Sequence, residues 1–149
     1  MENAHRYHAV AWWTSGQTGL AKSDSAPNAI HFTAPPQFGG LEGRWTPEDL
    51  LLTALASCFT TTFHSISLDT KFKYIDLQVE VDGTVRKMET GYGFSEIIIR
   101  PNLTIIDEES RERGLSLLQR AAGLCLVSRA LTPAPKFGIR IEIRKHSLA

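Results

Sequence analysis

The N-terminal third of the chain alternates polar and apolar residues over short stretches that are separated by turn-forming residues. Residues 8–13 are typical of a strand, residues 15–19 of a turn, and residues 20–34 of further extended chain. Pro27 and Asn28 interrupt the last of these segments, because both residue types are common in turns. We therefore expect three strands in this part of the chain.

Two later segments change to the helical period, in which apolar residues recur at intervals of three and four. Residues 35–45 are rich in proline and glycine and predict a loop; Thr46, a proline and two acidic residues then provide a helix start. Residues 50–68 are apolar on nearly every face, which predicts a buried helix. Asp107 can cap a second helix, whose first turn is also acidic.

Three further segments alternate with a period of two. Residues 74–87 and 94–106 predict a pair of antiparallel strands, in which Pro101 would have to lie at an edge or a bulge. Residues 137–144 predict a final amphipathic strand. The element order is therefore βββ-α-ββ-α-β, which predicts an α+β fold in a single domain over residues 1–149.

Composition narrows the class of protein. With 149 residues and 42% hydrophobic, the chain can bury one core, and its 16 basic residues balance its 16 acidic residues. It therefore has no excess charge to attract nucleic acid or a membrane surface. The start of the chain lacks the pattern of a signal peptide, and the longest mostly apolar run, residues 50–59, is too short to cross a bilayer. We expect a soluble cytoplasmic protein.

The two cysteines are the candidates for chemistry. Neither CxxC nor zinc-finger spacing is present, so a disulfide framework and a structural zinc site are both disfavoured. Because free cysteine is usually a small buried apolar residue, position alone favours a packing role for each. Each ends an apolar stripe with i, i+4, i+7 spacing: Leu51, Leu55 and Cys58 in the first helix, and Leu118, Ala122 and Cys125 in the second.

The sequence around each cysteine forms a motif. Residues 45–59 read WTPEDLLLTALASCF, in which a Pro-Glu pair opens the apolar helix that carries Cys58. Residues 125–131 read CLVSRAL. Both motifs and the order of elements resemble the OsmC/Ohr family (osmotically inducible protein C / organic hydroperoxide resistance), whose second motif is Cys-Pro-Val-Ser.

This resemblance implies a thiol peroxidase that reduces organic hydroperoxides to alcohols. Cys58 would attack the peroxide and become a sulfenic acid, and Cys125 would resolve it as a disulfide. An external dithiol, typically lipoyl-linked in the family, would then reduce the disulfide, and no flavin, haem or metal cofactor would be needed. The family also forms intertwined homodimers, with antiparallel sheets packed around two long helices.

In the family, an arginine held by a glutamate lies beside the attacking cysteine and favours its thiolate. Glu48 matches that glutamate by its motif. Ohr members carry the arginine in an early Gly-Gly-Arg turn, where this chain has Gln17. Arg44, in the loop before the first helix, is then the first candidate, and Arg129 is the second. Leu126 replaces the proline of the second motif.

Helix geometry suggests how two copies would complete the site. Glu48 and Cys58 lie roughly 15 Å apart along one straight helix, too far to share one arginine directly. In a twofold dimer, Glu48 of one copy could support the site of the other, and the apolar character of residues 50–63 favours such burial. Candidates for an apolar substrate pocket, although packing is the commoner role, are Trp12, Trp13, Phe38, Trp45 and Phe59.

Two other functions remain open. A small-molecule binding protein that has kept the fold without peroxidase turnover is favoured by the missing Gly-Gly-Arg turn. A thiol-dependent hydrolase would use Cys58 as an acyl nucleophile and would need a histidine base near it. His64 follows six positions later, about 120° around the helix, which disfavours that base, and Cys125 would have no use in such an enzyme.

Overall fold

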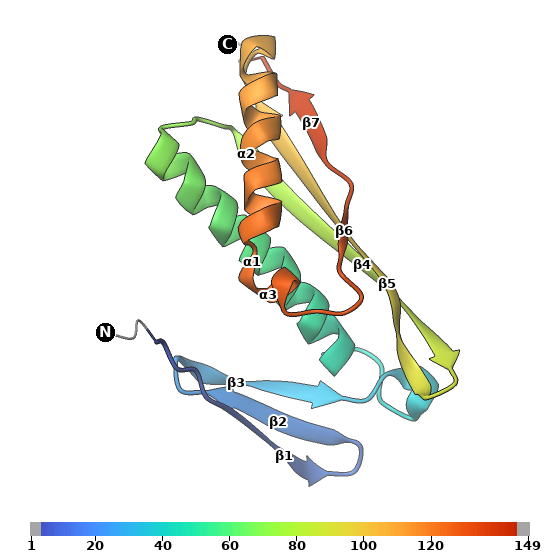
Figure 1. Cartoon of the computed structure of the whole chain (residues 1–149). Helices are drawn as coiled ribbons and strands as arrows, with labels where there is room; N and C mark the ends of the chain where they lie inside the picture. Colours follow the sequence, from blue (N-terminus) through green and yellow to red (C-terminus); the bar gives the residue numbers. More distant parts are fainter. Residues whose placement is uncertain (1–3, 146–149) are drawn as a thin grey trace. The chain divides into compact units, whose positions relative to one another are not determined.

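The computed structural model describes residues 4–145, and the chain divides into two compact units, residues 1–51 and 52–149. Residues 1–3 and 146–149 belong to the predicted domain but lie outside the described residues. Helices and mainly antiparallel strands are mixed along the chain in the predicted order (Figure 1). The α+β fold class is therefore confirmed.

The first unit holds a three-stranded antiparallel sheet in the order β1-β2-β3. Its strands are β1 (Ala9–Ser15), β2 (Thr18–Ser23) and β3 (Ala26–Thr33). The three strands are as predicted, but the interruption at Pro27 and Asn28 is wrong, because both residues lie inside β3. The β2–β3 register shifts at this point, and a proline is tolerated at such an irregularity on an edge strand.

Helix α1 (Pro47–Thr70) starts where the sequence predicts, after a short 3-10 helix, η1 (Pro36–Phe38). Thr46 and Asp49 cap the N-terminus of α1 with two hydrogen bonds. The Asp49 N–H donates to Thr46 Oγ1 at 3.1 Å, and the Thr46 N–H donates to Asp49 Oδ2 at 3.1 Å. This is a capping box, with aspartate in the place of the usual glutamate.

Only one face of α1 is buried within a single chain. The buried residues are Leu55, Phe59, Phe63, Ile66 and Ser67, whereas the apolar Leu68 is 66% exposed. Burial of the remaining apolar side chains of α1 stays part of the predicted dimer. The sequence underestimated the length of the apolar segment, which was predicted to end at residue 59. Helix α1 has 24 residues, and its most apolar window has a mean hydropathy of 1.3. By length and composition alone, such a helix could cross a membrane. Core helices of soluble proteins pass the same test.

The second unit is built on the antiparallel hairpin of β4 (Asp76–Met88) and β5 (Gly91–Ile105), as predicted. The chain then forms a 3-10 turn, η2 (Glu108–Ser110), helix α2 (Arg111–Leu124) and the short helix α3 (Leu126–Arg129). The predicted cap by Asp107 lies on η2 and not on α2 itself: Asp107 Oδ1 accepts the Ser110 N–H at 2.9 Å, and the N-cap of α2 is Ser110, which makes no side-chain capping hydrogen bond.

The predicted final strand is divided into β6 (Lys136–Phe137) and β7 (Arg140–Ile143), both parallel to β5. Strand β5 therefore has neighbours on both sides, so an edge position, one of the two predicted alternatives for Pro101, is wrong, whereas the ladder is irregular beside it as the other alternative requires. The Gly138 N–H donates to Ile99 O at 2.9 Å, and alternate residues of a strand direct their backbone groups to the same side. Pro101 thus faces the interruption between β6 and β7, where no ladder bond needs its missing N–H.

The hydrophobic core lies between one face of this sheet and helices α1 and α2, which run alongside the β4–β5 hairpin (Figure 1). Alternate residues of β5 point into it, as expected for a strand with one buried face. The buried cluster contains Leu55, Phe59, Phe63, Ile66, Phe72, Ile97, Ile99, Leu103, Ile105, Leu117, Leu118, Ala121 and Cys125. Cys58 packs against this cluster while remaining partly exposed.

Candidate functional site

The fold brings Cys58 and Cys125 together at the junction of α2 and α3. Cys125 is fully buried and has extended backbone angles (φ −61°, ψ 108°), so it ends one helix and starts the next. Its N–H donates to Ala121 O at 2.9 Å, and its carbonyl accepts the Arg129 N–H at 3.1 Å. Cys58 is half-buried on α1, and the two side chains form a hydrogen bond.

The backbone that follows Cys125 supplies hydrogen-bond donors to both sulfurs. The first N–H groups of a helix have no partner within the helix. Here the N–H groups of Val127 and Leu126 donate to Cys58, and those of Ser128 and Val127 donate to Cys125. The start of α3 thus supplies backbone donors to both sulfurs.

Hydrogen bonding favours the thiolate of Cys58. Burial raises the pKa of this thiol, but hydrogen bonds from the Val127 N–H, the Cys125 thiol, the Leu126 N–H and the Thr62 side chain outweigh burial. The net result is a pKa below the ordinary value of 9.0. Because the thiolate is the nucleophilic form of cysteine, Cys58 is the better nucleophile of the two.

Cys125 has the opposite tendency. Burial raises its pKa to about 11, the Ser128 N–H opposes this rise, and the hydrogen bond and charge of Cys58 add to it. Cys125 therefore keeps its proton and donates it toward the Cys58 thiolate. The arrangement suits chemistry in which the Cys58 sulfur attacks a substrate and the Cys125 sulfur then attacks the modified Cys58.

The supporting roles of Glu48, Arg44 and Arg129 stay predictions. Glu48 and Arg44 belong to the first unit, and no ion pair links them within residues 4–145. Glu48 Oε2 is buried without a hydrogen-bond partner among the described residues. Arg129 is exposed on α3. None of the causes of the lowered Cys58 pKa is a guanidinium.

Sequence reasoning missed the groups that do act on Cys58. Thr62 could have been found, because it lies four positions after Cys58 and thus on the same helix face. Leu126 also carried a signal, since any residue other than proline at that position has an N–H to donate. The partner of His64 is a tyrosine: its Nδ1 shares a hydrogen bond of 2.7 Å with the Tyr74 hydroxyl.

The aromatic residues proposed for a substrate pocket separate into two groups. Phe59 belongs to the core and packs against Phe137, with ring centroids 6.0 Å apart. The others are between 42% and 57% exposed in the first unit: Trp12, Trp13, Phe38 and Trp45. Trp45 and Arg44 line a pocket of about 550 Å³ in that unit.

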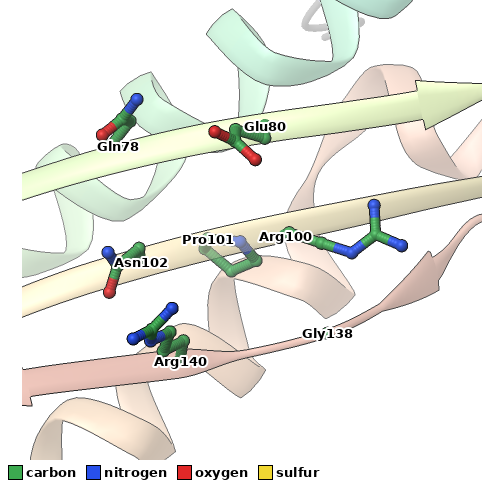
Figure 2. Close-up of a pocket in the computed structure, with 7 residues that line it drawn as sticks. All are labelled: Gln78, Glu80, Arg100, Pro101, Asn102, Gly138 and Arg140. Carbon is green, nitrogen blue, oxygen red and sulfur yellow. The ribbon is translucent and has the colours of Figure 1, made fainter.

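A second pocket, of about 190 Å³, lies on the polar face of the sheet (Figure 2). The positive charge of each arginine in this pocket is paired with a carboxylate: Arg100 pairs with Asp82, and Arg140 Nη2 lies 3.2 Å from Glu142 Oε1. Neither pocket contains a cysteine, so the thiol pair remains the candidate active site. The residues that line this second pocket are Gln78, Glu80, Arg100, Pro101, Asn102, Gly138 and Arg140.

Comparison with known proteins shows similarity in sequence and in fold. The uncharacterized protein YmaD of Bacillus subtilis (strain 168) is 23% identical over 130 residues, covering 85% of this chain and 87% of the relative. A crystal structure of an organic hydroperoxide resistance protein from Elizabethkingia anophelis matches with a TM-score of 0.76 and 21% identity, over 97% of this chain and 100% of that one. The structure of the OsmC-like protein of unknown function VCA0330 from Vibrio cholerae matches with a TM-score of 0.79 and 16% identity, over 91% and 99%.

A family model agrees with these matches. Residues 40–140 match the family described as OsmC-like protein, a segment that includes both cysteine motifs. The shared fold is a soluble one, which is consistent with α1 packing in a protein core. The chain belongs to the OsmC-like family.

Proposed function

We propose that the protein is a thiol-dependent peroxidase that reduces organic hydroperoxides to alcohols, with Cys58 as the attacking thiol and Cys125 as the resolving thiol. The observation that carries this proposal is the adjacent pair of thiols with opposite pKa shifts. Membership of the OsmC-like family and similarity to organic hydroperoxide resistance proteins support a peroxide-related role.

The chemistry uses each sulfur once. The Cys58 thiolate attacks the terminal oxygen of the hydroperoxide, the O–O bond breaks, and the alkoxide takes up a proton and leaves as alcohol. Cys58 is then a sulfenic acid. The Cys125 sulfur attacks it, a disulfide forms, and the hydroxyl leaves as water with the Cys125 proton. An external dithiol, in this family typically lipoyl-linked, restores both thiols and is itself oxidised to a disulfide.

Access to the two sulfurs agrees with this order of steps. Cys58 is partly exposed, whereas Cys125 is fully buried, so a peroxide from solvent meets Cys58 first. The sulfenic acid then forms beside a thiol that is already in hydrogen-bond contact. Fast resolution protects Cys58 from irreversible oxidation to sulfinic or sulfonic acid.

We propose further that residues 1–149 act as one OsmC-like domain in a cytoplasmic homodimer, with Glu48 and Arg44 supporting the site. Two observations support the dimer: α1 leaves apolar side chains such as Leu68 exposed, and Glu48 Oε2 is buried without a partner in the described part of the chain. Light scattering at micromolar concentration should give twice the mass of one chain. A mass equal to one chain would refute the dimer.

The peroxidase proposal is tested with the purified protein, cumene hydroperoxide and a dithiol. We expect continuous peroxide consumption and, without dithiol, a Cys58–Cys125 disulfide detected by mass spectrometry. Cumene hydroperoxide should react faster than hydrogen peroxide if an apolar surface receives the alkyl group, since burial contributes about 0.8 kcal/mol per methylene. If neither turnover nor the disulfide is observed, a binding protein without turnover, consistent with Gln17 in place of the Gly-Gly-Arg turn, replaces this proposal.

A further inference from the structure

The pocket on the polar face of the sheet is lined by side chains from three neighbouring strands (Figure 2). In the register of the sheet, Asn102 of β5 lies opposite Gln78 of β4 on one side and opposite Arg140 of β7 on the other. In the next row, Glu80 of β4 lies opposite Arg100 of β5. Residues two apart in a strand point to the same face, so these side chains gather over one area of the sheet.

The interruption of the third strand leaves room above this area. Strand β6 ends at Phe137 and β7 begins at Arg140, and Gly138 lines the pocket of about 190 Å³ between them. A Cβ atom at Gly138 would lie 3.5 Å from Arg100 Cγ, which is an ordinary contact. A longer side chain at position 138 would therefore occupy space beside Arg100 in the pocket.

One acceptor that lines this pocket is buried without a hydrogen-bond partner. Among residues 4–145, no group donates a hydrogen bond to Asn102 Oδ1. Buried polar atoms of folded proteins nearly always have a partner in the protein, in water or in a ligand. A ligand that satisfies Asn102 Oδ1 must carry a hydrogen-bond donor.

The charges around the pocket favour a donor that is also a cation. Arg100 pairs with Asp82 rather than with Glu80, its register partner. Arg140 pairs with Glu142. Glu80 therefore has no ion pair in the part of the chain that the structure describes, and the carboxylates around the pocket outnumber its arginines by one.

We propose that this pocket binds a primary ammonium group, which donates hydrogen bonds to Asn102 Oδ1 and to the carboxylate of Glu80. These two residues are diagonal neighbours on adjacent strands, a separation that one small cation between long side chains can bridge. An ammonium group has three N–H donors and no acceptor, and Gln78 offers a third acceptor through its amide oxygen. The site lies on the face of the sheet opposite the core, so it is independent of the proposed peroxidase.

Binding is measured by NMR spectroscopy of the ¹⁵N-labelled protein, with propylammonium chloride as the probe. We expect saturable shifts of the Asn102 side-chain amide and of the backbone amides of Arg100 and Gly138, with a dissociation constant of roughly 1 to 10 mM. Tetramethylammonium has the same charge but no N–H donor, so it should cause no saturable shift. Equal binding of both cations would overturn the proposal, because charge alone would then explain the shifts.

A matched pair of variants tests the carboxylate. Glu80→Gln keeps the size of the side chain and removes its charge, so it should weaken propylammonium binding about tenfold. Glu89→Gln makes the same change in net charge in the exposed turn between β4 and β5, and it should bind like wild type. Unchanged binding by Glu80→Gln, or equal weakening in both variants, would overturn the proposal.

A third variant tests the pocket itself. Gly138→Val adds a side chain beside Arg100 and leaves both acceptors in place, so it should abolish saturable binding. Circular dichroism verifies that each variant is folded. Wild-type affinity in a folded Gly138→Val variant would show that the cation binds elsewhere and would overturn the proposal.

The ammonium group could belong to a simple amine or to an amino acid, and glycine distinguishes these sources. Its carboxylate could face Arg140, on the β7 side of the pocket. Tighter binding of glycine than of propylammonium would identify an amino acid, and weaker binding would identify a simple amine. If neither compound shifts the Asn102 amide saturably at up to about 100 mM, the pocket holds only solvent and the proposal fails.

Discussion

Cys58 lies within a continuous helix and is half-buried, whereas Cys125 lies at the break between two helices and is fully buried. Both end an apolar stripe of the same spacing. The middle of α1 presents its sulfur to N–H groups from another segment, and the pKa of Cys58 falls. At the α2–α3 junction burial dominates, and the pKa of Cys125 rises to about 11.

The difference shows that the pattern of residues along a helix does not decide what a thiol does. Burial acts on both sulfurs in the same direction. Each sulfur also receives two backbone N–H groups, so side-chain donors separate them: Cys58 accepts from the Cys125 thiol and from Thr62, whereas Cys125 gives its proton to Cys58. Each cysteine therefore shifts the pKa of the other: Cys125 lowers that of Cys58, and Cys58 raises that of Cys125.

The most direct test of this difference is to replace one cysteine at a time. Cys58→Ser should abolish turnover of cumene hydroperoxide, because the attacking thiolate is lost. Cys125→Ser should consume about one equivalent quickly as Cys58 becomes a sulfenic acid, and excess peroxide should then oxidise that sulfenic acid further to sulfinic or sulfonic acid, one equivalent for each step. Peroxide consumption and mass spectrometry of the intact protein measure both. Full turnover by Cys58→Ser would reverse the assignment.

A smaller but still large difference is expected in alkylation at neutral pH. One pKa is below 9.0 and the other about 11, and each unit changes the thiolate fraction tenfold. Cys58 should therefore react with iodoacetamide roughly a hundredfold faster than Cys125 or more. Quantitative peptide mass spectrometry of the reduced wild-type protein compares the two sites in one sample. Equal rates across neutral pH would contradict the assignment.

The smallest effect is expected in alkaline stability. In the unfolded chain Cys125 ionises near 9.0, whereas in the folded protein it keeps its proton to about 11. Between these values the unfolded state has released a proton that the folded state retains, so the free energy of unfolding should fall as the pH rises. Urea unfolding under reducing conditions from pH 8.5 to 11 measures this loss.

Cys125→Ala is the matched variant for the alkaline experiment, because it removes the titrating group from a buried apolar site. Its stability should fall less steeply over the same pH range. Cys58→Ala should keep most of the slope, since burial is the largest cause of the raised Cys125 pKa. The same slope in Cys125→Ala and wild type would show that other groups cause the alkaline loss.

Much of the fold follows from periodicity and end signals. The start of α1 was predictable because Thr46 and Asp49 form a local capping pair, and the β4–β5 hairpin because alternation marks a half-buried sheet. The division of the last strand into β6 and β7 could not be predicted from that strand alone, since it lies beside Pro101 of the neighbouring strand β5. The position of Pro27 within β3 depends likewise on a register irregularity against β2, which a single segment cannot reveal.

The sequence predicted the two cysteines of the site but not the groups that surround their sulfur atoms. The motifs around Cys58 and Cys125 identified the pair, but proximity between them arises only from the packing of α2 against the core. The donors to Cys58 are mainly backbone groups, and every residue type except proline offers the same N–H. Reasoning from side chains therefore could not identify the amides of Leu126 and Val127 as donors to Cys58.

The complete burial of Cys125 has a consequence for the return half of a redox cycle. In a disulfide between these two cysteines, a thiol from solvent could reach only the sulfur of Cys58, so Cys125 would be the leaving group. A thiol with a high pKa is a poor leaving group. Its departure requires a proton, and the speed of regeneration would then depend on how readily one reaches the α2–α3 junction.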